Sequence, residues 1–185
     1  FVSAKSTSKG KFKIDSTLKP TLEECKDEET RKIVYSQLWE VAIHRIRRSF
    51  DSVHGGNNFI EGDSNEIGTE IIVGGKNKGD IYRVKDNIVT MVYRHIHGNL
   101  INIFTHQVLN TDKGYLTTNY TSQYLHPISK TPIKNKLIFE DEFIPLFDEG
   151  PYVLKSRKIM QKINNKEEIG SERFIFSNLE LNDKS

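Results

Sequence analysis

The stretch IVTMVYRHIHGNLINIFTHQVL, residues 88–109, decides the fold. Its hydrophobic period is two on either side of Gly98-Asn99, and the side chains of a β-strand alternate between the two faces of a sheet. Gly98-Asn99 itself favours a tight two-residue hairpin turn. The stretch therefore predicts two paired antiparallel strands, Ile88–His97 and Leu100–Leu109.

The same period continues outward from this hairpin. Asp86-Asn87 predicts a second tight turn, and prolines separate the later segments. Phe1–Asp15 is typical of one or two short strands, and His54–Gly68 is typical of a polar loop that holds a short strand around Phe59 and Ile60. The remaining predicted strands are Glu70–Val73, Asp80–Lys85, Gly114–Tyr124, Lys134–Phe143, Tyr152–Ile163 and Arg173–Leu181. This order predicts an antiparallel meander that curves into a half-barrel, a barrel or a strongly bent sheet.

One long amphipathic helix precedes the meander. Its apolar residues recur at helical spacing and form one stripe: Val34, Leu38, Val41, Ala42, Ile46 and Phe50. Thr21-Leu22-Glu23-Glu24 has the form of a capping box, so the helix is predicted from about Thr21 or Asp27 to Ser49. The fold class is therefore α+β, mainly β, with the helix packed on the sheet.

Length and composition favour one domain spanning residues 1–185. A net charge of +2 argues against nucleic acid as a partner. Cys25 is the only cysteine, so no internal disulfide forms, and no apolar run is long enough to span a membrane. The chain starts at Phe1 rather than Met, so we expect a processed or late N-terminus and a truncated first strand.

The hairpin predicts one face rich in histidine. If His97 lies opposite Leu100, the odd-numbered residues from Val89 to His97 share a face with the even-numbered residues from Leu100 to Val108. On this pairing His106 lies roughly 13 Å along the strand from His95, so a three-histidine zinc site fails. His95 and His97 alone are a weak metal signal, and we interpret them as half-buried histidines at a cavity mouth or sheet edge. We predict that the concave side of the sheet is lined by Trp39, Tyr93, His95, His97, Phe104 and His106.

Basic residues gather at the predicted end of the helix. His44, Arg45, Arg47 and Arg48 lie on neighbouring turns, and His54 follows closely. Such a cluster matches the helix dipole, or it binds an acidic protein surface, a lipid headgroup or a phosphate. Glu140 and Glu142 share a strand face, which we interpret as an exposed face whose charge nearby lysines offset. We therefore predict no catalytic residue, no metal and no required cofactor.

Several blocks resemble a family of unknown function found in cyanobacteria and plastids. They run from about residue 10 to residue 181: Gln37-Leu38-Trp39-Glu40, Ile43–Phe50, His54-Gly55, Val73–Lys76, Arg94–Gly98, Phe139–Glu142 and Phe174–Asn178. The resemblance implies an oxygenic phototroph and a place in cyanobacterial cytoplasm or chloroplast stroma, with peripheral thylakoid association. It implies no activity. A helix held by a curved sheet is also similar to lipoprotein-carrier half-barrels and lipocalin-like bilin lyases, at the level of fold.

Three functions follow as expectations. The first is a non-enzymatic accessory, assembly or carrier protein that binds an apolar ligand, a lipid or a pigment, or a partner protein in a concave sheet. The second is an enzyme or lyase that acts on a tetrapyrrole through His95 and His97. The third is a structural subunit of a larger photosynthetic complex, with the sheet edge as its interface.

Overall fold

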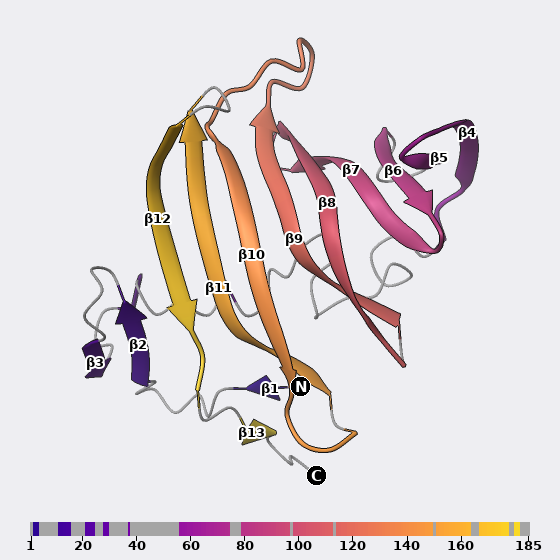
Figure 1. Ribbon diagram of the computed structural model, residues 1–185. Coiled ribbons are helices and arrows are strands. Elements are labelled where there is room, and N and C mark those ends of the chain that lie inside the picture. The colour runs from indigo at the N-terminus through magenta and orange to yellow at the C-terminus, as the bar shows by residue number, and fades with distance from the viewer. Residues whose placement is uncertain are drawn as a thin grey trace.

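An antiparallel sheet dominates the computed structural model (Figure 1). The structure describes residues 2–3, 11–15, 21–24, 28–29, 37, 56–74, 79–96, 98–112, 114–149, 151–163, 167–177 and 180–181. Within these residues, an 11-stranded sheet has the order β3-β2-β12-β11-β10-β9-β8-β7-β6-β5-β4, and β1 pairs with β13 in a separate 2-stranded sheet. From β4 to β12 each strand pairs with its sequence neighbour, which confirms the predicted meander.

The strand bounds follow the predicted pattern closely. β6 (Asp80–Lys85) and β11 (Tyr152–Ile163) have the predicted bounds. The Asp86-Asn87 turn between β6 and β7 is also confirmed, because both residues have positive φ, 52° and 62°, as a tight hairpin turn of this kind requires. The other strands of the meander are β4 (Phe59–Asn65), β5 (Gly68–Val73), β7 (Ile88–Ile96), β8 (Asn99–Thr111), β9 (Gly114–Leu125), β10 (Lys136–Pro145) and β12 (Glu167–Ile175).

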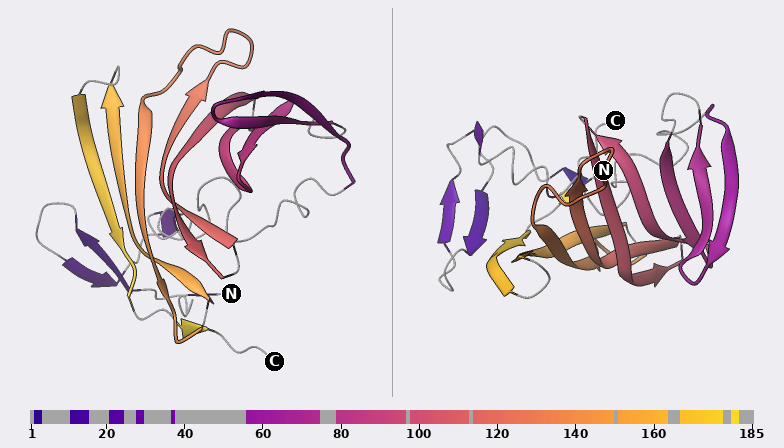
Figure 2. Two further views of the ribbon diagram at one scale, coloured as in Figure 1. Left: turned by 45° about the vertical axis from the view of Figure 1, so that its right-hand side comes forward. Right: turned by 90° about the horizontal axis from the view of Figure 1, so that it is seen from above.

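The described strands form an open, strongly curved sheet (Figure 2). Its edge strands are β4 and β3 (Thr21–Glu24), which do not pair with each other. β2 (Lys11–Asp15) joins β3 to β12, while the small sheet holds β1 (Val2–Ser3) and β13 (Glu180–Leu181). The described strands therefore bend around a concave side without closing into a barrel.

Three predictions about local structure need correction. Thr21–Glu24 is strand β3, paired with β2, so the capping box predicted there is wrong. β4 has seven residues where mainly a loop was predicted, and β12 begins at Glu167, six residues before the predicted Arg173. Glu28, Glu29 and Gln37 have helical backbone, and the rest of the predicted helix lies outside the described residues. The long helix thus stays a prediction.

The hairpin of β7 and β8 has a different register from the one predicted. His95 lies opposite Leu100 and Ile96 lies opposite Asn99, so Asn99 joins the strand and Gly98 lies in the turn. Gly98 has a φ of 77°, which glycine adopts without the steric cost of a Cβ. The register moves by two residues, and because the side-chain period is also two, each residue keeps its face.

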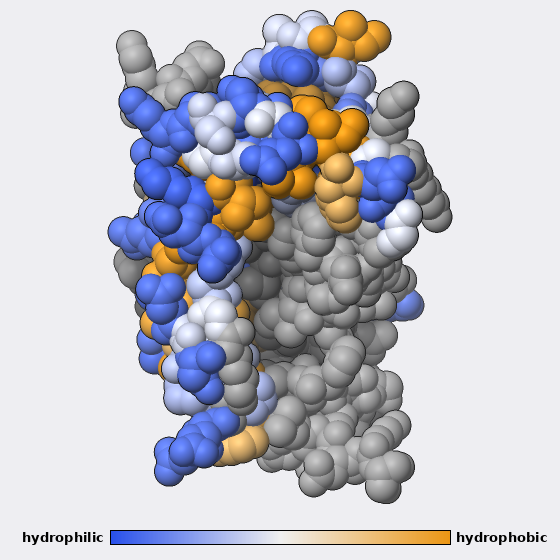
Figure 3. Space-filling model, turned by 90° about the vertical axis from the view of Figure 1, so that its right-hand side faces the viewer, coloured by the Kyte–Doolittle hydropathy of each residue, from blue (hydrophilic) through white to orange (hydrophobic). Residues whose placement is uncertain are grey.

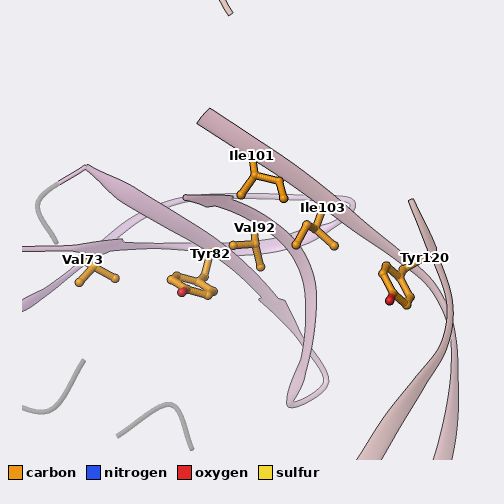
Figure 4. Packing of buried hydrophobic residues seen from close by; sticks show 6 residues of the cluster. All are labelled: Val73, Tyr82, Val92, Ile101, Ile103 and Tyr120. Atoms are coloured by element: carbon orange, nitrogen blue, oxygen red, sulfur yellow. The ribbon is translucent and has the colours of Figure 1, made fainter. Parts of the chain in front are cut away.

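The apolar core lies on the concave side of the bend. Figure 4 shows six buried side chains from β5 to β9 on the inner side of the curved strands: Val73, Tyr82, Val92, Ile101, Ile103 and Tyr120. Tyr82, Val92 and Ile103 lie directly opposite one another in the register, so they share a face. We call these six residues the concave cluster.

A β-bulge moves one residue to this face. Between Arg83 and Val84 the register of β6 and β7 shifts, so Val84 lies opposite Val89 while Arg83 lies opposite Met91. Val89 therefore packs against the concave cluster, although it was predicted to share a face with Met91. The Thr90 hydroxyl donates to the Arg83 carbonyl over 3.1 Å and so holds the bulge.

Truncating Ile103 tests which face is the core. Ile103→Ala removes buried apolar atoms from the concave cluster, so we expect a loss of about 2–5 kcal/mol in the free energy of unfolding, measured by urea denaturation. Ile60→Ala is the control, because Ile60 is 60% exposed on the edge strand and should cost less than about 0.5 kcal/mol. Equal losses in the two variants would contradict this assignment of the core.

Candidate ligand-binding face

The concave face combines a buried floor with a partly accessible rim. Val73, Tyr82 and Val92 at its centre have no exposed surface. Tyr120 extends the floor toward β10, where its ring stacks on that of Phe139 at 4.5 Å. Half-buried residues surround the floor: Ile71, Val89, Ile96, Tyr124 and Phe139. The face is therefore apolar across six neighbouring strands, and among the described residues of this cluster the partly exposed ones lie at its margin.

A buried ion pair borders the cluster on β10 and β11. The Arg157 side chain donates from Nε to Asp141 Oδ1 over 2.7 Å and from Nη2 to Oδ2 over 2.6 Å. Both side chains are almost fully buried, with 1% and 0% of their surface exposed. Arg157 also lies 5.5 Å from the ring centre of Phe139. This two-point geometry is the strongest form of arginine–carboxylate pairing.

Gln37 also accepts hydrogen bonds from Arg157. Nη1 of Arg157 donates to the Gln37 carbonyl over 3.0 Å and to its side-chain oxygen over 3.3 Å. Burial raises the pKa of the Asp141 carboxyl, and the hydrogen bonds and charge of Arg157 oppose that rise. The pair thus joins two strands of the sheet to the segment at Gln37 on the concave side.

A second charged group lies at the opposite margin of the face. Asp80, 3% exposed, accepts a hydrogen bond from the His95 backbone N–H over 2.9 Å. Its carboxylate oxygens also lie 3.4 Å from His95 Nδ1 and 3.5 Å from Arg94 Nε. Arg94 pairs with Ile101 in the register, so it belongs to the concave face. Among the described residues, Arg94 Nε is buried without a hydrogen-bond partner.

The predicted site residues that the structure describes lie on the convex face. Tyr93 is adjacent to Val92 on β7 and pairs with Asn102, so it points away from the concave cluster. His95 and Phe104 share its face. His106 stands at a bulge of β8 and contacts the Thr121 hydroxyl on this side over 3.2 Å. They therefore do not line the concave side as predicted, and their role in binding stays a prediction.

Comparison with known proteins places the chain in a family. A family model described as "Protein of unknown function (DUF3386)" matches residues 1–181. The chain belongs to the DUF3386 family. No curated protein and no solved structure matches it.

Other candidate residues of this DUF3386 chain lie outside the described residues. They are Trp39, His44, Arg45, Arg47, Arg48, His54 and His97. Within the described ranges, no group of three or more His, Cys, Asp or Glu residues is arranged to hold a metal ion. No helix of the described part is long and apolar enough to cross a membrane.

The acidic run on β10 divides between the two faces. Glu140 and Glu142 are exposed, as predicted, whereas Asp141 between them is buried. Glu142 accepts a hydrogen bond from Lys155 over 2.6 Å, and this bond is the main cause that lowers the pKa of its carboxyl. Sequence reasoning missed Asp141 and Arg157. The available signal was the alternation itself, which places the middle residue of an acidic run on the opposite face.

A hollow of about 540 Å³ lies at the start of β10, and sequence reasoning also missed it. Three lysines contribute to its lining, together with four residues of β9 and the β9–β10 connection: Lys134, Lys136, Lys162, Gln123, Pro132, Ile133 and Asn135. The Lys134 ammonium lies 4.8 Å from the ring centre of Tyr124, on the rim of the concave face. A basic hollow thus adjoins the apolar rim.

Breaking the buried ion pair tests its structural role. Arg157→Ala leaves the Asp141 carboxylate buried and unpaired, so we expect a loss of about 3–5 kcal/mol in the free energy of unfolding. The neighbouring pair is a matched control: Lys155→Ala removes an exposed partner of Glu142 and should cost less than about 1 kcal/mol. If chemical denaturation shows equal costs, the buried pair has no special role.

Proposed function

We propose that this protein is a non-enzymatic carrier or assembly protein that binds an apolar ligand, a lipid or a pigment, on its concave face. The observation that carries the proposal is the contiguous apolar surface on the inner side of an open, curved sheet. Ligand sites are mostly apolar and concave, with a few fixed polar groups that set orientation. An apolar segment of a partner protein is recognised by the same chemistry.

The margin of the concave face supports this function. Ile96 and Tyr124 are half-buried and pack against the concave cluster, so an apolar ligand reaches the face at this point. Arg94 lies on the same face, opposite Ile101, and supplies a charged group that orients an amphipathic ligand. The resemblance of the sequence blocks to proteins of cyanobacteria and plastids favours an oxygenic phototroph, in cytoplasm or stroma.

Ligand capture by a rim variant tests the proposal. We expect native mass spectrometry of the chain, purified after incubation with a lipid extract of a phototroph, to show one bound lipid or pigment. Ile96→Gln makes the rim polar and should weaken capture by about tenfold, because it removes apolar contact of about 1.5 kcal/mol. Ile60→Gln, on the exposed edge strand, is the control and should bind like the wild type. A chain that captures nothing would contradict the proposal.

One observation favours a second function, an enzyme that acts on a tetrapyrrole. The buried carboxylate of Asp80 lies 3.4 Å from His95 Nδ1, and the imidazole of His95 is 49% exposed. A carboxylate that orients an imidazole, with the other ring nitrogen toward solvent, is a common arrangement for a general base. His95 would then transfer a proton at Nε2, on the convex side.

Two substitutions distinguish the enzyme function from the carrier function. If His95 is a base, His95→Ala should abolish turnover of an added bilin or chlorophyll precursor, followed by absorbance, and Asp80→Asn should lower the rate by roughly 10²-fold or more. His106→Ala is the control, since its imidazole lies elsewhere on the convex face. A wild-type chain that leaves the pigment unchanged would exclude the second function.

A further inference from the structure

The connection between β9 and β10 carries a highly exposed isoleucine at its tip. Ile128 is 87% exposed, and Ile133 in the same connection is 45% exposed. Figure 1 shows this connection projecting beyond the ends of the strands, and Figure 3 shows hydrophobic surface beside hydrophilic residues at the same height. A single exposed isoleucine is common on a protein surface, so its meaning depends on the shape and charge of the residues around it.

Hydrogen bonds hold the tip in a defined shape. The His126 N–H donates to the Thr131 carbonyl and the Lys130 N–H to the His126 carbonyl, each over 2.8 Å. The backbone N–H groups of Ile128 and Ser129 donate to His126 Nδ1 over 3.3 and 3.2 Å. The chain is therefore folded so that Ile128 is presented outward.

The chain segment that forms the tip carries charge of one sign. Residues 113–139 contain no Asp or Glu, and the connection itself carries Lys130 and Lys134, with Lys136 at the start of β10. The basic hollow described above opens beside Ile133, which lines it. Lys162 also lines this hollow, but it lies opposite an acidic residue, Glu168, in the strand register. Substitutions that test the role of positive charge are therefore placed at Lys130 and Lys136.

The opposite end of the sheet provides a natural contrast. The β10–β11 connection also exposes an aromatic residue, Phe147, which is 55% exposed. There the apolar side chain is followed directly by Asp148 and Glu149. An anionic surface would repel that end and attract the other. The two ends of β10 therefore differ in charge although both expose an apolar side chain.

We propose that the β9–β10 connection docks on an anionic lipid bilayer. Ile128 and Ile133 would enter the boundary between headgroups and acyl chains, while Lys130, Lys134 and Lys136 contact lipid phosphates. The basic hollow has the size and charge to receive a headgroup. Apolar insertion and attraction of basic residues to anionic lipid are the two terms that give reversible membrane binding. This docking does not require a ligand on the concave face.

Vesicle flotation of the 185-residue chain tests the proposal. We expect binding to vesicles of phosphatidylglycerol and phosphatidylcholine in equal parts, little binding to phosphatidylcholine alone, and weakening by added salt. Ile128→Ser should lower the affinity about tenfold, since it removes an apolar side chain that would be buried in the bilayer. Lys130→Gln and Lys136→Gln should each lower it about fivefold.

Phe147→Ser is the matched control, because it removes an exposed apolar side chain from the acidic end and should leave vesicle binding unchanged. Thermal unfolding should show that the Ile128 and lysine variants are as stable as the wild type. The proposal is overturned if the wild type does not float with phosphatidylglycerol vesicles, or if Phe147→Ser weakens binding as much as Ile128→Ser. Binding of the basic connection to an acidic protein, without vesicle binding, would also overturn it.

Discussion

The side-chain period of the meander constrains every other feature of this protein. Since alternate residues of each strand face opposite sides, the curved sheet places an inner set of side chains from β5 to β9 on its concave side and the other set on its convex side. A charged residue that falls in the inner set must be paired after it is removed from water. Arg157 meets that requirement through Asp141 and Gln37. The paired hydrogen bonds between Arg157 and Asp141 are thus a consequence of β10 and β11 placing both residues on the inner face.

Local chemistry explains what the sequence could predict. Strand bounds and the Asp86-Asn87 turn depend on period and turn residues, which are readable along the chain. Strand β4 lacks that signal because all seven of its residues are exposed, so no apolar alternation marks it. The predicted register of the β7–β8 hairpin was wrong because a glycine such as Gly98 suits either position of a two-residue turn. Pairing across the whole strand, and not the turn alone, decides between the two registers.

The faces and the site depend on contacts that are distant in sequence. Both residue sets of β7 contain apolar side chains, so its sequence alone does not indicate which set is concave. The choice follows from pairing with β6 and β8, where Tyr82 and Ile103 flank Val92. Asp141 and Arg157 are sixteen residues apart and Asp80 and His95 are fifteen apart, on neighbouring strands. A bulge then reassigns Val89, which no strict alternation predicts.

The geometry also joins the two proposed surfaces at one end of the sheet. Tyr124 is a rim residue of the concave face, and its carbonyl accepts a hydrogen bond from the Ile133 N–H in the β9–β10 connection over 3.0 Å. Lys134 covers the ring of the same tyrosine. A bilayer that bound the connection would therefore lie beside the accessible margin of the apolar face. An apolar ligand leaving the bilayer at this point would reach Tyr124 directly. It would not have to pass the acidic end of the sheet near Asp148. Membrane docking and ligand exchange would therefore take place at the same end of the protein.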